Sequence, residues 1–265
     1  MKIFIISCPH LSEQRLPSLI KGLVPSLETG LIENIELIVG SDEIIAKKAK
    51  EFYEPSSWSK HILLAWPAFY RNIIGVQLKS SKINKSISDL ITNDINHIDP
   101  LLVFPQRNLT PIEISITNRH FLAWKLASHY EGRSLILEDD AIPVNSYQLN
   151  QLLLFLNQNF IQDQFIDLAD DYIPPVLSKV KDLKQFKDII YTFRERAIVR
   201  TLMAYSITNK LAQSILEFHS GYSLPVDMHL QYLLTSIKAS GLTITSPVFT
   251  HESKSGKYNS STESR

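Results

Sequence analysis

The sequence of 265 residues contains a single cysteine, Cys8. A chain with one thiol cannot form an intramolecular disulfide, which excludes the disulfide-rich scaffolds of small secreted proteins and favours a reducing compartment. The apolar run that opens the chain stops before Pro9 and is too short for the hydrophobic segment of a signal peptide. We therefore expect a cytoplasmic protein.

Long apolar runs and an excess of one charge are also lacking. No segment of the sequence reaches the ~18 uninterrupted apolar residues that usually span a bilayer. Basic and acidic residues number 27 each, so the chain has no general basic field to attract nucleic acid. The sequence therefore predicts no transmembrane segment and no nucleic-acid partner, and it leaves only peripheral contact with a membrane.

Several common enzyme motifs are absent from the sequence. It has no G-x-x-x-x-G-K-[ST] loop, no G-x-G-x-x-G that opens a helix, no G-x-S-x-G elbow and no H-E-x-x-H helix. These absences exclude the most frequent forms of ATPase, dehydrogenase, serine hydrolase and zinc protease.

Alternating strand and helix patterns predict an α/β fold with a parallel sheet covered by helices. In the first 53 residues we expect strands at 2–7 and 35–39, followed by helices at 11–23 and 43–53 respectively. Residues 41–105 are predicted to be an irregular, insertion-like region of a single domain at 1–250, and 251–265 a polar tail. Between 54 and 105, prolines interrupt the pattern, and this segment either covers a cleft or connects elements on the surface.

A well-marked helix is predicted to begin after Thr110. Thr110 can cap it, Pro111 suits its first position, and Glu113 completes a capping box. Gly132 is placed to end this helix. Further elements are expected along the rest of the chain: strands at 134–140, 164–170, 188–193, 196–208 and 242–249, and helices at 151–160, 209–220 and 225–240.

The strand predicted at 134–140 ends in three consecutive acids, Glu138, Asp139 and Asp140. Adjacent like charges repel and resist burial, so a positive partner is expected. Because side chains alternate along a strand, Glu138 and Asp140 should point one way and Asp139 the other. Two carboxylates on one side suit magnesium or manganese. The alternative is a solvated acidic turn at the end of the strand.

A second acidic segment, FIDLADDY, also follows an apolar run. Its Asp167, Asp170 and Asp171 are either a second set of metal ligands or, as we favour, an ordinary exit from a strand.

Four blocks of the sequence, in this order, resemble glycosyltransferase family 25, the lipopolysaccharide and lipooligosaccharide glycosyltransferases. They are MKIFIIS followed by SEQRLPSLIKGL, LTPIEISITNRHFLAWKLA leading into LILEDDAI, RTLMAYSITNKLAQSIL, and LPVDMHL. The family pattern LTPGEIGCxLSH becomes LTPIEISITNRH here, which lacks both glycines and retains His120. The family's acidic Asp-Gly motif after the second strand is replaced by GSDE.

The resemblance implies a GT-A-like fold, a mixed sheet with a nucleotide-binding Rossmann-like half and helices on both faces. It also implies a nucleotide-sugar donor, UDP-linked by preference, and an acidic motif that holds a divalent metal against the donor diphosphate. Here EDD would fill that role. On this basis Glu138, Asp140 and His251 are the predicted ligands of Mn²⁺ or Mg²⁺. For His251 the alternative is an exposed histidine of the tail.

The same resemblance suggests further site residues. Ser7, Arg15 and Asp139 are predicted to bind the nucleotide, although a solvated helix arginine is an equal alternative for Arg15. Asp227, in the block LPVDMHL, is predicted to be the general base that takes the proton of the acceptor hydroxyl. An acid in the first turn of a helix is also stabilised by the helix dipole without any catalytic role.

The expected function is that of a metal-dependent, inverting hexosyltransferase. It would transfer a hexose, with a slight preference for galactose, to a surface-glycan or lipooligosaccharide acceptor met at the inner face of the cell membrane. One alternative is a non-catalytic relic that binds a nucleotide-sugar or a glycan, suggested by the altered helix motif. Another is a different phosphate-handling metalloenzyme, which only the acids support.

Overall fold

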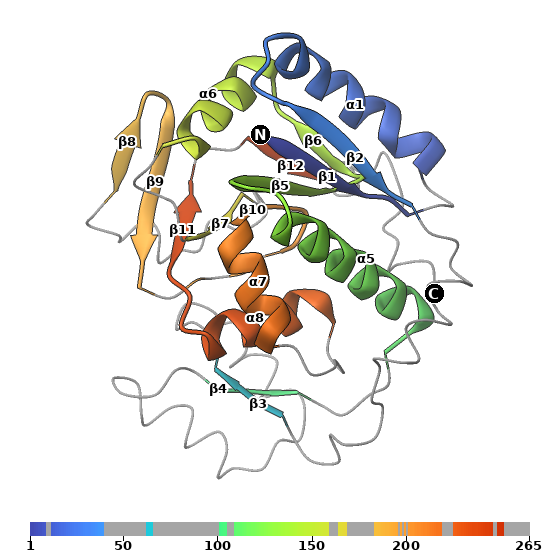
Figure 1. Ribbon diagram of the computed structural model, residues 1–265, viewed down its shortest axis with the longest axis vertical. Helices are drawn as coiled ribbons and strands as arrows, with labels where there is room; N and C mark the ends of the chain where they lie inside the picture. The colour runs from blue at the N-terminus through green and yellow to red at the C-terminus, as the bar shows by residue number, and fades with distance from the viewer. Residues whose placement is uncertain are drawn as a thin grey trace.

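The three-dimensional structure is a computed structural model that describes most of the chain. The described residues are 1–8, 12–39, 62–65, 101–104, 109–158, 164–168, 183–195, 197, 199, 201–218, 225–245 and 248–251. They form a mixed eight-stranded sheet with helices on both faces (Figure 1). The α/β class and the mixed sheet are therefore confirmed. The parallel sheet predicted from the strand and helix pattern is wrong, because β10, β8 and β9 make antiparallel pairs in it.

The main sheet has the strand order β2-β1-β5-β10-β7-β11-β9-β8. Its strands are, in that order, Asn34–Ile38, Lys2–Ile6, Arg133–Glu138, Ala204–Thr208, Phe165–Asp167, Gly241–Ile244, Ile189–Arg194 and Lys184–Phe186. Strand β1 is parallel to β2 and β5, and β7 is parallel to β11, whereas β10 is antiparallel to both β5 and β7. Strands β2, β1, β5, β7 and β11 therefore all end at one edge of the sheet, called here the carboxyl edge.

Two short antiparallel pairs complete the described strands. β6 (Ala141–Pro143) pairs with β12 (Phe249–His251), and β3 (Ile62–Ala65) pairs with β4 (Leu101–Phe104). β3 and β4 lie in the region for which no strand was predicted. The single strand expected at 242–249 is wrong, because β11 and β12 are separate strands.

Helices cover the sheet from two sides (Figure 1). α1 (Ser12–Glu28) and α6 (Ser146–Leu156) contact each other on one side. α5 (Pro111–Ser128), α7 (Asn209–Phe218) and α8 (Val226–Ser236) contact one another on the opposite side. The two sides are called here the α1 face and the α5 face.

The start of α5 is built as the sequence predicts. The backbone N–H of Glu113 donates to Thr110 Oγ1 at 3.2 Å, and the backbone N–H of Thr110 donates to Glu113 Oε2 at 2.8 Å. With Pro111 in the first turn, this reciprocal capping box satisfies two backbone N–H groups that the helix itself leaves without partners.

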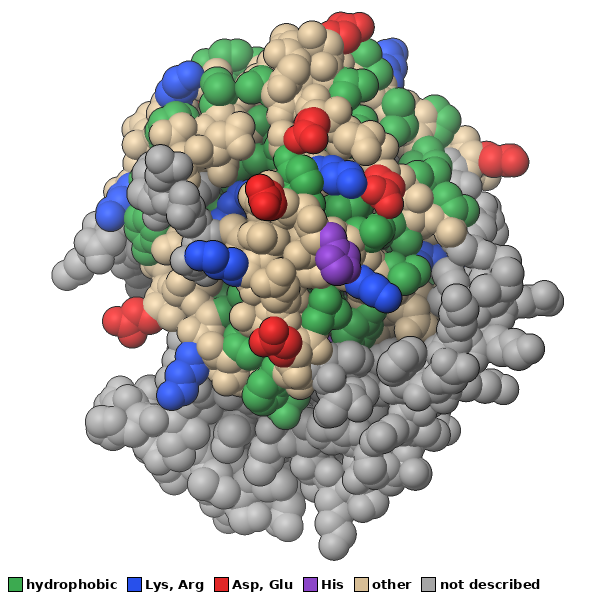
Figure 2. Space-filling model, in the orientation of Figure 1, with side chains coloured by type: hydrophobic (Ala, Val, Ile, Leu, Met, Phe, Trp, Pro, Cys, Tyr) green, Lys and Arg blue, Asp and Glu red, His purple; other side chains and the backbone are tan. Residues whose placement is uncertain are grey.

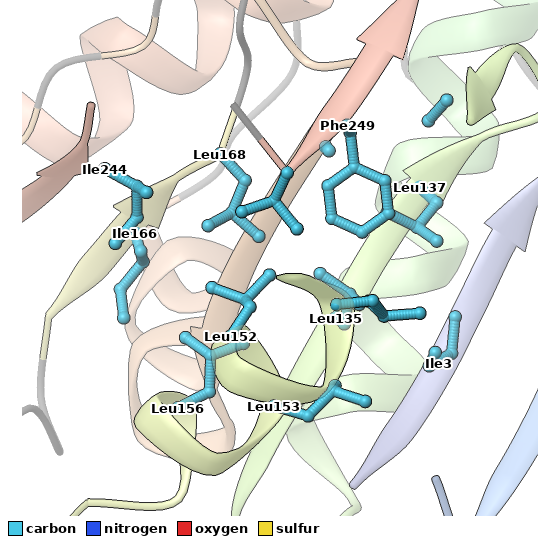
Figure 3. Close-up of a cluster of buried hydrophobic side chains, with 14 of the residues drawn as sticks. Ile3, Leu135, Leu137, Leu152, Leu153, Leu156, Ile166, Leu168, Ile244 and Phe249 are labelled. Carbon is cyan, nitrogen blue, oxygen red and sulfur yellow. The ribbon is translucent and has the colours of Figure 1, made fainter. Parts of the chain in front are cut away.

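Both faces of the central strands are buried, as is usual for strands covered by helices on both sides. Ile3 and Ile5 of β1 join the core of the α1 face, whereas Phe4 and Ile6 join the core of the α5 face. Figure 3 shows the first of these cores, in which Leu137 of β5 lies beside the ring of Phe249 and Leu135 lies near α6. The apolar alternation along each strand thus supplies two cores.

Two predicted boundaries are wrong near the acids. β5 ends at Glu138 instead of 140, and Asp139 and Asp140 form a turn into β6. β10 begins at Ala204 instead of 196. The helix predicted at 43–53 and the tail beyond His251 lie outside the described residues.

Candidate functional site

The acids lie at the carboxyl edge, where β1 and β5 end side by side. Ile6 of β1 is the register partner of Glu138 of β5, so Ser7 and Cys8 run next to the acidic turn. The backbone N–H of Cys8 donates to Asp139 Oδ2 at 2.6 Å. This hydrogen bond joins the segment that follows β1 to the turn that follows β5.

Arg15, in the first turn of α1, is a positive partner of the acids. Its Nη1 lies 3.1 Å from Asp139 Oδ1 and 3.7 Å from Asp140 Oδ2. Arg15, Asp139 and Asp140 are 2%, 2% and 4% exposed. The alternatives of a solvated acidic turn and a solvated helix arginine are therefore wrong for these residues.

Burial is the largest influence on the pKa of Asp139. Desolvation raises the pKa of this carboxyl above its ordinary value, while the N–H of Cys8 and the charge and hydrogen bond of Arg15 oppose the rise. The neighbouring charge of Asp140 raises the pKa further. One guanidinium thus faces two buried carboxylates and alone balances only half of their charge.

His251 meets Asp140 from the far end of the chain. β12 pairs with β6 so that His251 is the register partner of Ala141, the residue after Asp140. His251 Nδ1 lies 3.2 Å from Asp140 Oδ2, and its side chain is 17% exposed. His251 therefore ends a strand at the site, and its placement in an exposed tail is wrong.

Glu138 turns to the other face of the sheet. Its Oε1 lies 3.3 Å from Nε2 of His120, which belongs to α5. The opposite directions of Glu138 and Asp139 follow the expected alternation. The strand ends before Asp140, however, and Asp140 shares Arg15 with Asp139, so the premise that Glu138 and Asp140 lie on one strand face fails.

Sequence reasoning missed the residues behind Glu138. In the sequence, His120 stands out only as a retained motif position, and Trp124 and Tyr205 lie in patterns typical of core packing. Tyr205 is wholly buried, and desolvation raises its pKa well above the ordinary value. The signal available in the sequence was the spacing of His120 and Trp124, four residues apart, which places both on one side of a helix.

The remaining predicted residues lie apart from these contacts. Ser7 is fully buried after β1, and its Oγ has no hydrogen-bond partner among the described residues. Asp227 is partly buried in the first turn of α8, which packs against α5 and α7 on the α5 face. Asp167 ends β7, and Asp170 and Asp171 lie outside the described residues.

A divalent cation fits part of this arrangement. Within the described ranges, no three His, Cys, Asp or Glu side chains group to hold an ion. Asp140 and His251 nevertheless bring one carboxylate and one imidazole together at 3.2 Å. Magnesium is commonly held by one or two carboxylates while substrate phosphates and water supply its other ligands. The two side chains therefore fit such an ion only together with a phosphate-bearing ligand.

No family model matches the chain, and a search of curated proteins finds no match either.

Proposed function

We propose that this protein is a metal-dependent glycosyltransferase with a GT-A-like fold. It transfers a hexose, with galactose preferred, from a UDP-sugar to a surface-glycan or lipooligosaccharide acceptor, with inversion. The observation that carries the proposal is the contact of His251 with Asp140 beside the buried Arg15–Asp139 pair. In open α/β sheets ligands bind at the carboxyl ends of the strands, where this group lies.

Asp140 and His251 would hold Mn²⁺ or Mg²⁺ at the carboxyl edge, where the donor diphosphate would supply further ligands. Glu138 points to the α5 face and would contact the donor instead of the ion. When bound, the cation stabilises the negative charge that develops on the leaving diphosphate. Arg15 and Asp139 hold the segments after β1 and β5 together, which keeps Asp140 in place. Ser7 follows β1 at the same edge, where its Oγ is buried and has no hydrogen-bond partner among the described residues.

Asp227 is assigned as the general base toward the acceptor. Inverting transfer needs a base on the side of the sugar opposite the leaving diphosphate. An acid in the first turn of α8 comes from a different layer than the turn after β5, which suits this separation. A carboxylate in this role contributes roughly 10²- to 10⁴-fold in rate.

A lipid-linked acceptor would place the protein at the inner face of the cell membrane. None of the helices in the described part of the chain is long and apolar enough to cross a bilayer. On the face seen in Figure 2, acidic and basic side chains are interspersed over the described surface. Contact with a membrane is accordingly proposed as peripheral, made through the acceptor.

The test is donor hydrolysis, measured with purified protein and manganese across common UDP- and GDP-sugars. Slow hydrolysis of one UDP-sugar identifies the donor without knowledge of the acceptor. The Asp140→Asn variant should abolish the manganese dependence of UDP binding, measured as thermal stabilisation, because a ligand stabilises a protein only as far as it binds the folded state. Asp188→Asn, at an exposed turn, is the matched control and should bind as the parent does.

The remaining outcomes separate the alternatives. With an acceptor in hand, Asp227→Asn should lose transfer and keep the binding of UDP and manganese. Donor binding without any turnover by the parent would instead indicate a non-catalytic binding relic. Binding with no preference for uridine would indicate another phosphate-handling enzyme, and full manganese-dependent UDP binding by Asp140→Asn would refute the assigned metal ligand.

A further inference from the structure

A chain of hydrogen bonds crosses the core of the α5 face and ends at Glu138. Trp124 Nε1 donates to the hydroxyl of Tyr205 at 2.8 Å. That hydroxyl lies 2.9 Å from Nδ1 of His120, and the opposite ring nitrogen, Nε2, lies 3.3 Å from Glu138 Oε1. The chain thus links helix α5, strand β10 and the last residue of β5.

The direction of each hydrogen bond follows from its donors. The indole of Trp124 can only donate, so the oxygen of Tyr205 accepts there and its own hydrogen remains available. If His120 Nδ1 also donated to this oxygen, the buried hydroxyl hydrogen would have no other acceptor among the described residues, at a cost of about 1–3 kcal/mol. Tyr205 therefore donates to Nδ1, and the ring carries its proton on Nε2, facing Glu138.

Tyr205 is suited to act as the donor in this hydrogen bond. Burial raises the pKa of its hydroxyl well above the normal value, so the group keeps the proton that it donates. The Tyr205 and His120 rings also stack, with centroids 5.8 Å apart and planes 23° from parallel. Both residues are fully buried, so packing and hydrogen bonding together restrict rotation of the imidazole.

The chain ends at the one acid of the three that is open to solvent. The Glu138 side chain is 28% exposed, whereas the side chains of Asp139 and Asp140 are 3% and 5% exposed. His120 contacts Oε1 of this carboxylate. A fully buried, oriented imidazole behind a partly exposed carboxylate is the arrangement by which proteins orient groups that bind ligands.

We propose that His120, held by Tyr205 with its proton on Nε2, is a positioning residue that fixes the Glu138 carboxylate for contact with the donor at the carboxyl edge. This inference rests on the proposed glycosyltransferase function. His120 and Tyr205 act on Glu138 from the α5 face. Asp139 and Asp140 make their ionic contacts on the α1 face. Removal of a supporting hydrogen bond of this kind typically lowers metal affinity or activity about 10- to 100-fold.

Two substitutions that replace the His120 imidazole with an amide test which ring nitrogen is needed to support Glu138. An asparagine amide reaches the position of Nδ1, so His120→Asn keeps a polar group beside Tyr205 and loses the contact with Glu138. A glutamine amide reaches the position of Nε2, so His120→Gln can still donate to Glu138. Thr117→Val is the control from the same helix, because it removes a 2.7 Å hydrogen bond from the Thr117 hydroxyl to the carbonyl of Glu113 and leaves the hydrogen bonds of His120 and Tyr205 in place.

The first measurement is manganese-dependent UDP binding, with donor hydrolysis beside it. His120→Asn should weaken binding or turnover about 10- to 100-fold, and His120→Gln should recover most of that loss. Thr117→Val should leave binding unchanged, because it does not alter the contact of His120 with Glu138. Equal binding by His120→Asn and the parent, or equal losses in both His120 variants and Thr117→Val, would overturn the proposal.

The second measurement needs no donor. The ¹⁵N shifts of the His120 ring should report a proton on Nε2 in the parent, and Glu138→Gln should move the Nε2 resonance. A parent that neither binds nor hydrolyses any nucleotide-sugar refutes the proposed function, and the ring shifts then still decide whether the chain holds Glu138. A ring protonated on Nδ1 would refute the positioning role even in an active enzyme.

Discussion

The two faces of the sheet treat the acidic segment differently. On the α1 face, Asp139 and Asp140 are buried against the charged Arg15, and His251 meets Asp140. On the α5 face, Glu138 is partly exposed and is met by the end of a hydrogen-bond chain of buried aromatic side chains. Three neighbouring acids in the sequence therefore receive ionic support on one side and largely uncharged, directional support on the other.

Ion pairs and hydrogen bonds between buried side chains have different effects on the acidic segment. Buried charges are costly to remove from water, so an ionic cluster must stay complete to be tolerated, and it joins chain segments firmly when it is. A hydrogen-bond chain costs less to bury, and its geometry sets where a side chain points. We infer that the α1 face holds the turn in place and the α5 face aims the one accessible carboxylate.

The largest effect is expected from removing the charge on the α1 face. Arg15→Met keeps much of the side-chain volume and leaves two buried carboxylates without their guanidinium. Loss of one partner from a buried ion pair costs about 3–5 kcal/mol, so the free energy of unfolding, measured by urea denaturation, should fall by about that amount. Lys21→Met, an exposed position of the same helix, should change it by less than about 0.5 kcal/mol. A loss for Arg15→Met as small as that of Lys21→Met would remove the contrast between the faces.

A smaller loss is expected from the α5 face. Tyr205→Phe deletes one hydroxyl and leaves the Trp124 indole N–H and His120 Nδ1 buried without their partner. An unsatisfied buried polar group costs about 1–3 kcal/mol, and urea denaturation should show a loss in that range. Tyr147→Phe removes an exposed tyrosine hydroxyl bonded to Asp188 and should leave the urea midpoint unchanged. A Tyr205→Phe loss equal to that of Arg15→Met would mean that the α5 face is as dependent on its polar contacts as the α1 face.

The smallest effect is a change in pH dependence. The raised pKa of Asp139 means that the folded protein binds more protons than the unfolded chain at pH values just above the ordinary carboxyl value of 3.8. The contribution of Asp139 to the free energy of unfolding must therefore fall as pH rises through this window. Asp139→Asn removes this titration, so its stability should fall less steeply than that of the parent between about pH 4 and 6, measured by urea denaturation with EDTA present. Parallel profiles would show that Arg15 and the Cys8 N–H fully compensate for burial.

Much of the fold was predictable because the signals are local. The capping box at Thr110 and Glu113 needs residues only three apart, and β1 and β2 are short apolar runs at nearly the expected positions. β6 and β12 were missed because each has only three residues and exists by pairing with the other, more than 100 residues away. The end of β5 was misplaced because the turn at Asp139 is set by contacts with Cys8 and Arg15.

The candidate site was predictable only in part. The three acids were recognisable as candidate site residues, because three like charges after an apolar strand need a positively charged partner. The identity of that partner was not predictable, because Arg15 lies 124 residues before Asp139 and nothing in its local pattern distinguishes it from a solvated helix arginine. Tyr205 gave no signal at all, because a tyrosine within an apolar strand usually indicates only core packing.

The sequence by itself determined the elements that depend on neighbours along the chain: the start of α5, the apolar strands, and an acidic segment that resists burial without compensation. Only the tertiary structure decided which residues compensate the charge of each acid. The pairing of β1 with β5 and of β6 with β12 brings Cys8, Arg15 and His251 to Asp139 and Asp140, and the pleat of β5 turns Glu138 toward His120. The physical reason is that hydrogen bonds and ion pairs act over a few ångströms in space, whatever the separation of their residues in sequence.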